Sequence, residues 1–174
     1  MSIILRSMTK VYDWLVYSMA WLAGGVIVAT FMAIIVDVVL RNAGLKTPAW
    51  TSAFSEYAML IAAMAAAPLV IRERGHVWVE IIATVTGPRL QRILGLIAVL
   101  LCIAISLVMA WYATVMAFDA SMRGEVDIRS VIMPRWFLYS VLAVGFTLCA
   151  TEFARFLVRG EDMYVRSSEL QEGL

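Results

Sequence analysis

Hydrophobic residues fall along this chain in four long blocks, and the charged residues gather mainly between the blocks. The apolar positions do not alternate with polar ones, as they would in a half-buried strand. The blocks predict helical spans at about 14–40, 49–71, 90–118 and 135–158. At about 1.5 Å per residue each span can cross a hydrocarbon core of about 30 Å. The pattern therefore predicts an all-α integral membrane protein with four transmembrane helices.

Turn residues mark where these helices begin and end. Asn42-Ala43-Gly44 is typical of a helix C-terminus, and Thr47-Pro48 of a helix start. The short connection between them predicts that the first two helices run antiparallel. Arg123-Gly124 predicts a turn within a polar connection, and Pro134 opens the fourth helix.

A shorter segment, 76–86, lies between the second and third spans. Its apolar positions share one helical face, which predicts an amphipathic helix lying flat in the membrane interface. The residues expected to anchor it there are Trp78, Ile81, Ile82 and Val85. We therefore expect one four-helix membrane domain over 1–160, followed by a polar tail over 161–174.

Composition agrees with a membrane protein, because 63% of the residues are hydrophobic and 16% are charged. A net charge of +1 gives no reason to expect nucleic-acid binding. Cys102 and Cys149 stand inside apolar blocks and are expected to be small core residues. With one histidine, His76, the chain favours neither a haem nor a zinc site. We expect no catalytic, cofactor or metal site, and no enzyme.

Basic residues predict the orientation. Nine of the 14 lie in the N-terminus, the second connection and the C-terminus, against five in the first and third connections. Loops rich in Lys and Arg stay in the cytoplasm, so both termini and the amphipathic helix are expected on the cytoplasmic side of the membrane.

Three polar or small-residue features stand out within the spans. Asp37 and Arg41 form an i,i+4 pair at the end of the first helix. Glu56 is the one charged residue between Pro48 and Ile71. A carboxylate there costs up to roughly 3 kcal/mol unless it is paired or protonated, so we expect it to face protein at a helix contact. A proton or cation site, or a hydrated carboxylate in an outer vestibule, are the alternatives for Glu56.

The second span also carries a stripe of alanines, which would let another helix approach closely. The stripe consists of Ala58, Ala62, Ala65 and Ala66.

These residues, taken in order, resemble a known family. Arg41, then Trp50 and Glu56, then Arg72-x-x-Gly75-His76-x-x-Val79-Glu80 and Pro134-x-Trp136, are similar to the small membrane subunit of tripartite ATP-independent periplasmic (TRAP) transporters, the DctQ-like family. The resemblance covers the chain up to about Arg159.

The resemblance implies a sodium-coupled uptake system for organic acids, in which a periplasmic binding protein delivers the substrate. Substrate and sodium sites would belong to a separately encoded large membrane subunit, which this chain would brace as a heterodimer. Arg41, Trp50, Glu56, Arg72, Gly75 and His76 would then be structural or partner-interface residues.

Two other functions remain open on the sequence. A small oligomeric transporter could use Glu56 as its ion site, and transport by the chain alone would reveal it. A membrane anchor of a redox enzyme would carry a haem, which the single histidine disfavours.

Overall fold

The computed structural model describes residues 2–46, 50–73, 88–128 and 131–159. Its elements, in chain order, are α1 (Ser2–Asn42), α2 (Trp50–Arg72), α4 (Pro88–Arg123), β1 (Val126–Ile128), β2 (Ile132–Pro134) and α5 (Arg135–Arg159). The predicted interfacial helix, together with Gly75, His76, Trp78, Ile81, Ile82 and Val85, lies outside the described residues.

Four helices are long and apolar enough to span a membrane, over Lys10–Asn42, Trp50–Arg72, Ile93–Arg123 and Arg135–Val158. The predicted all-α membrane class is confirmed. The first and third helices are longer than their expected spans, since α1 has 41 residues and α4 has 36. Their extra turns carry the chain beyond the hydrocarbon thickness.

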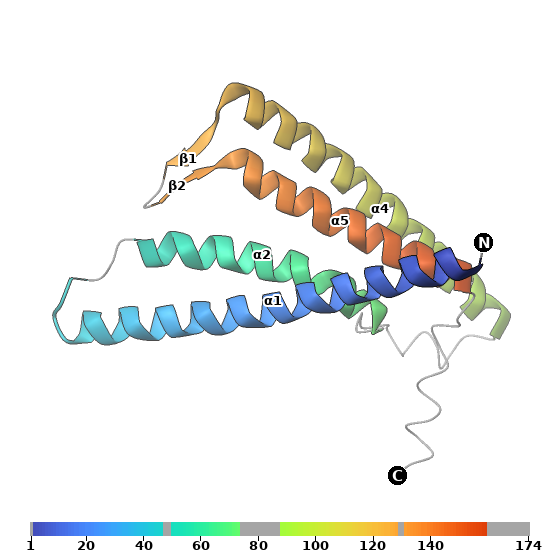
Figure 1. Ribbon diagram of the computed structural model, residues 1–174, viewed down its shortest axis with the longest axis horizontal. Helices are drawn as coiled ribbons and strands as arrows, with labels where there is room; N and C mark the ends of the chain where they lie inside the picture. The colour runs from blue at the N-terminus through green and yellow to red at the C-terminus, as the bar shows by residue number, and fades with distance from the viewer. Residues whose placement is uncertain (1, 47–49, 74–87, 129–130, 160–174) are drawn as a thin grey trace, which may run out of the picture.

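The helices form two antiparallel pairs, α1 with α2 and α4 with α5, and α2 also packs against α5 (Figure 1). The pairs converge at the end that holds the N-terminus and spread apart toward the opposite end. We call the converging end the charged end, where α1 begins and α2 and α5 finish. The opposite end, where the β-strands lie, is called the hairpin end.

Glycine ends both long helices by the same mechanism. Gly44 has φ +71° and Gly124 has φ +61°, a left-handed conformation that suits glycine. At the end of α1 the amide of Leu45 donates to Leu40 O, and that of Gly44 to Arg41 O. An equivalent pair of bonds surrounds Gly124. The predicted helix end at Gly44 and the predicted turn at Gly124 are confirmed, but α4 continues to Arg123, past the expected end of the third span at about 118.

Strands β1 and β2 form an antiparallel hairpin that the sequence did not predict. Its register pairs Val126 with Pro134 and Ile128 with Ile132. The sequence suggested only a polar connection here, because each strand has three residues and no clear alternation. The hairpin leans from the α4/α5 pair toward the start of α2 (Figure 1).

Helix α2 is the most enclosed of the four: 33% of its most apolar window is buried, against 11% for α1. Its alanine stripe packs inside this chain, where Ala62 and Ala65 join Ala23 of α1 in one buried cluster. Ala58 is buried as well, and Ala66 packs against the cluster. Ala62 and Ala65 thus pack within this chain, where α1 supplies the close helix contact that the stripe predicts.

A second cluster joins α2, α4 and α5 near the charged end, around Ile71, Val99, Cys149 and Phe153. Cys149 is buried within it, and Cys102 packs against it as a free thiol. Both cysteines are therefore small core residues, as predicted.

Helix α5 comes close to α2 at Gly145. A Cβ at this position would lie 2.8 Å from Met64 Sδ and 2.9 Å from Met64 Cβ. A hydrogen atom is therefore the largest substituent that this contact between α5 and α2 accepts.

Candidate functional site

Four charged side chains from three helices meet at the charged end. Asp13 comes from α1, Arg72 is the last residue of α2, and Glu152 and Arg155 lie in α5. Two acids and two bases make the group neutral overall. We call these four residues the ionic network.

Glu152 is the most deeply buried member, with its side chain 3% exposed. Arg72 Nη2 donates to Glu152 Oε1 at 2.5 Å, and its Nε donates to the same oxygen at 3.2 Å. Arg72 Nη2 also lies 3.1 Å from Asp13 Oδ1. The arginine thereby connects α1, α2 and α5.

Arg155 completes the network. Its Nη1 donates to Asp13 Oδ1 at 3.0 Å and lies 3.6 Å from Glu152 Oε1. The i,i+3 spacing of Glu152 and Arg155 by itself predicts a helix-end pair worth a few tenths of a kcal/mol. The structure contains that pair, but Glu152 is buried and its main partner is Arg72, 80 positions away.

Two tyrosines of α1 extend the network. The guanidinium carbon of Arg155 lies 4.9 Å from the centre of the Tyr12 ring, and that of Arg72 lies 5.6 Å from it. Arg72 is also 5.7 Å from the Tyr17 ring. Aromatic faces attract such cations, more strongly where water is excluded. Among the described residues, the buried Tyr12 hydroxyl has no hydrogen-bond partner.

At the hairpin end, the arginines of the ion pairs are more exposed than those of the ionic network. Tyr57 Oη donates to Asp127 Oδ2 at 2.9 Å and so holds β1 against α2. Arg135 Nη1, at the start of α5, lies 3.2 Å from Glu125 Oε2 at the base of the hairpin.

The predicted Asp37–Arg41 pair is present at the hairpin end. Arg41 Nη2 donates to Asp37 Oδ2 at 3.1 Å, with the arginine side chain 73% exposed. Thr51 Oγ1 donates to the other oxygen, Asp37 Oδ1, at 3.1 Å. Asp37 thus links the end of α1 to the start of α2, beyond the i,i+4 pair that the spacing predicts.

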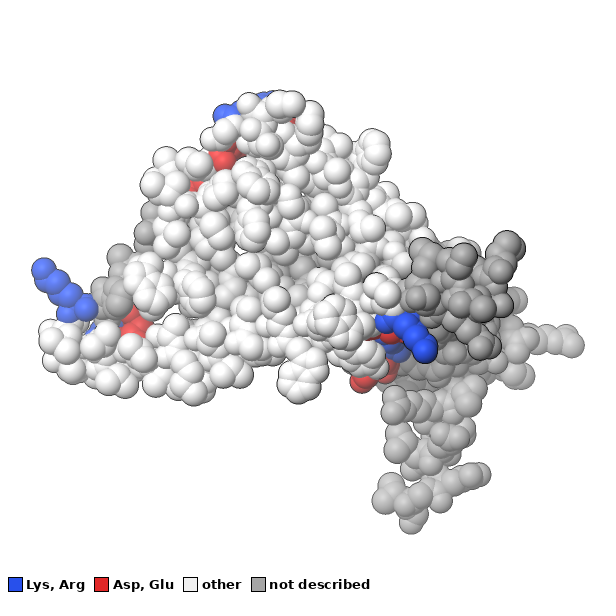
Figure 2. All heavy atoms as spheres, viewed as in Figure 1, with Lys and Arg blue, Asp and Glu red and all other residues white. Residues whose placement is uncertain are grey.

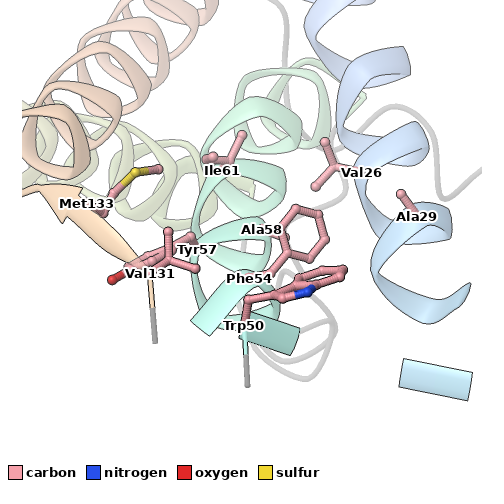
Figure 3. Close-up of a pocket in the computed structure, with 9 residues that line it drawn as sticks. All are labelled: Val26, Ala29, Trp50, Phe54, Tyr57, Ala58, Ile61, Val131 and Met133. Carbon is pink, nitrogen blue, oxygen red and sulfur yellow. The ribbon is translucent and has the colours of Figure 1, made fainter. Parts of the chain in front are cut away.

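An apolar pocket of about 310 Å³ lies between α1, α2 and the hairpin (Figure 3). Figure 3 shows the Trp50 and Phe54 rings on the side of α2 that faces α1, and Val131 and Met133 on the hairpin side. Its lining consists of Val26, Ala29, Trp50, Phe54, Tyr57, Ala58, Ile61, Val131 and Met133. This pocket was not predicted, because its wall is assembled from segments more than 20 residues apart in the sequence.

Glu56 lies on the exposed side of α2. The buried face of α2 runs through Ala58, Ala62 and Ala65, and Glu56 does not lie on it. The expectation that Glu56 faces protein at a helix contact stays a prediction. At 100° per residue, Glu56 shares its side of the helix with Ser52, Met59 and Ala63, all of them exposed. We call these four residues the outer stripe of α2.

Charged side chains of the described residues gather at the two ends of the molecule, and the surface between them is white in Figure 2. Within the described ranges, no group of three or more His, Cys, Asp or Glu residues could hold a metal ion. The visible face is thus an apolar band bounded by charge.

Comparison with known proteins decides the family. The model of the family described as "Tripartite ATP-independent periplasmic transporters, DctQ component" matches residues 30–162, which is most of the chain. This chain belongs to the DctQ family. The matched range contains the hairpin and three of the four residues of the ionic network, namely Arg72, Glu152 and Arg155. The family consists of transporter components and not of enzymes.

A curated relative is the C4-dicarboxylate TRAP transporter small permease protein DctQ of Pseudomonas aeruginosa. It is 31% identical over 91 residues, which cover 51% of this chain and 43% of the relative. The aligned part therefore spans less than half the length of that protein. No solved structure matches the chain.

Proposed function

We propose that this chain is the small membrane subunit of a sodium-coupled TRAP transporter for organic acids, in which it braces and anchors a large transport subunit. Sodium and substrate would bind in the large subunit, and a periplasmic binding protein would deliver the substrate transiently. The name of the Pseudomonas relative favours C4-dicarboxylates within the class of organic acids.

The observation that carries the proposal is Glu56. This carboxylate lies about 9 Å from the start of a 23-residue membrane helix, and it points away from the core of its own chain. An ionisable side chain inside a membrane helix almost always faces protein or water and not lipid, whether or not it is paired, so the outer stripe is expected to be covered by protein or to line a hydrated cavity.

The composition of the outer stripe favours a protein partner. Ser52 and Ala63 are small, and small or polar residues at one helix face permit close packing between membrane helices. Arg41 and Trp50 lie exposed near the same end, where they can contact the partner or the membrane interface.

The ionic network supports a bracing role. Its charged groups neutralise one another within the chain, and they fix three helices relative to each other at one end. Among the described residues, the buried charge is thus committed to holding the bundle together. A rigid bundle gives a fixed reference against which a mobile transport domain can move.

The predicted helix at 76–86 would add the anchoring part of the function. Trp78, Ile81, Ile82 and Val85 would set the depth of the bundle in the inner leaflet, with both termini cytoplasmic. Gly75 and His76 would join this segment to α2.

Reconstitution in liposomes tests the proposal. Each membrane subunit alone and both together are assayed for uptake of a C4-dicarboxylate with binding protein and a sodium gradient. We expect sodium-driven uptake only when both are present. Uptake by this chain alone, or full uptake by the large subunit without it, overturns the proposal.

The outer stripe allows a sharper test. Ala63→Trp should prevent copurification of the large subunit, because a bulky side chain holds the partner helix away. Ala104→Trp, on the exposed face of α4, is the matched control and should leave copurification intact. Glu56→Gln should weaken the complex without changing the sodium stoichiometry of uptake, and a changed stoichiometry would place Glu56 in the ion path instead.

A further inference from the structure

The apolar pocket at the hairpin end is bounded by α1, α2 and the hairpin. Trp50 and Phe54 at its rim are 48% and 39% exposed, so the pocket is open to its surroundings. The depth of the pocket, its volume, its apolar lining and the basic residues near its rim indicate which kind of molecule binds in it.

The depth of the pocket matches one leaflet of a bilayer. Its lining on α2 runs from Trp50 to Ile61, which is about 16 Å along the helix axis. Half of a hydrocarbon core of about 30 Å has nearly the same thickness. Trp50 is the first residue of α2, so the pocket begins at the membrane interface, where tryptophan is enriched, and reaches the middle of the bilayer.

The volume of the pocket is too small to enclose a whole helix. A helix about 10 Å across and 16 Å long has a volume on the order of 1,300 Å³. The pocket offers about 310 Å³. A thin hydrocarbon chain can enter a space of this size and make contacts on several sides.

The charge beyond the rim suits a phospholipid headgroup. Arg41 and Lys46 lie just before Trp50 in the chain, at the same end of the bundle, and both are exposed. Cationic side chains at the membrane surface attract anionic lipid headgroups.

We propose that this pocket binds one acyl chain of a membrane phospholipid, with its headgroup phosphate near Arg41 and Lys46 and its methyl end near Val26 and Ile61. The acyl chain fills the space between α1, α2 and the hairpin, where the two helix pairs diverge. This lipid site is independent of which substrate the transporter carries.

Photo-crosslinking tests the site. The full chain, with the subunits that copurify with it, is reconstituted into phosphatidylethanolamine and phosphatidylglycerol vesicles that contain a trace of phosphatidylglycerol with a diazirine on one acyl chain. A diazirine near the chain end should label Val26, Ile61 or Met133. One near the glycerol should label Trp50 or Phe54.

Ala29→Phe places an aromatic ring in the pocket, and we expect it to reduce labelling at Ile61 and Met133 by about tenfold, equivalent to about 1.4 kcal/mol. Ala104→Phe on α4 is the matched control, since Ala104 is exposed and lies outside the lining, and it should leave labelling unchanged. The same thermal unfolding profile in both variants shows that the bundle is intact.

Three results would overturn the proposal. Labelling could be spread evenly over exposed apolar residues of α1 and α4, it could fall equally in both variants, or a photoreactive residue at position 29 could crosslink to another protein and not to lipid. The last result would assign the pocket to a partner side chain. Uptake is not the readout, so failure here leaves the proposed bracing function standing.

Discussion

The two ends of this bundle are held together by different kinds of interaction. At the charged end, four ionised side chains from α1, α2 and α5 lie within 4 Å of one another in pairs, and Glu152 is almost fully buried. At the hairpin end, a tyrosine–aspartate hydrogen bond and an apolar pocket stand where the helix pairs diverge. The charged end is therefore suited to rigidity, and the hairpin end to accommodating another molecule.

The difference follows from the residues available at each end. Arginine has several donors in a planar fork and can bind two carboxylates at once, as Arg72 does. The start of α2 instead offers the aromatic rings of Trp50 and Phe54, which lie on its side toward α1 and line the apolar pocket. Alanines in the middle of the same helix allow close contact with α1.

The largest expected effect comes from breaking the ionic network. Arg72→Leu leaves Glu152 buried with Arg155 as its remaining partner at 3.6 Å, so the free energy of unfolding should fall by about 3–5 kcal/mol. Unfolding in mixed micelles with increasing denaturing detergent measures this. Arg72→Leu with Glu152→Leu should recover most of the loss, because Arg155 keeps Asp13 at 3.0 Å.

Arg123→Leu is the control for the loss of an arginine. Arg123 is 65% exposed and pairs with Asp119 within one helix, so its replacement should lower the free energy of unfolding by less than about 1 kcal/mol. Equal losses for the two single variants would show that the network adds no rigidity.

A smaller effect is expected where the helix pairs meet. Gly145→Ala should lower the free energy of unfolding by about 1–3 kcal/mol, because the added Cβ meets Met64 Cβ as well as its flexible sulfur. Gly25→Ala is the control, since a Cβ there meets nothing within 4 Å and alanine favours the helix. If both variants unfold alike, the two pairs are not in close contact at Gly145.

The smallest effect is expected at the hairpin end. Tyr57→Phe removes the hydroxyl that donates a hydrogen bond to Asp127, so the free energy of unfolding should fall by about 1 kcal/mol. Hydrogen exchange of the amides in 126–134 should accelerate, while that of α5 near Glu152 should not. Tyr112→Phe, at an exposed position on α4, should change neither quantity.

The sequence by itself determined the helices and their ends. Long apolar blocks require helical structure in a membrane, because every backbone polar group must be satisfied within the segment. Gly44 marked a helix end and Gly124 marked a turn, because both need a conformation that other residues adopt poorly. The Asp37–Arg41 pair was predictable because partners four residues apart always share a helix face.

Tertiary structure alone decided which faces meet. Arg72 and Glu152 are 80 positions apart, and no local period connects them. The alanine stripe predicted a close helix contact, but only packing showed that α1 supplies it and that Glu56 points outward. A helix fixes the angle between its own side chains, whereas the choice of neighbour depends on every helix in the bundle.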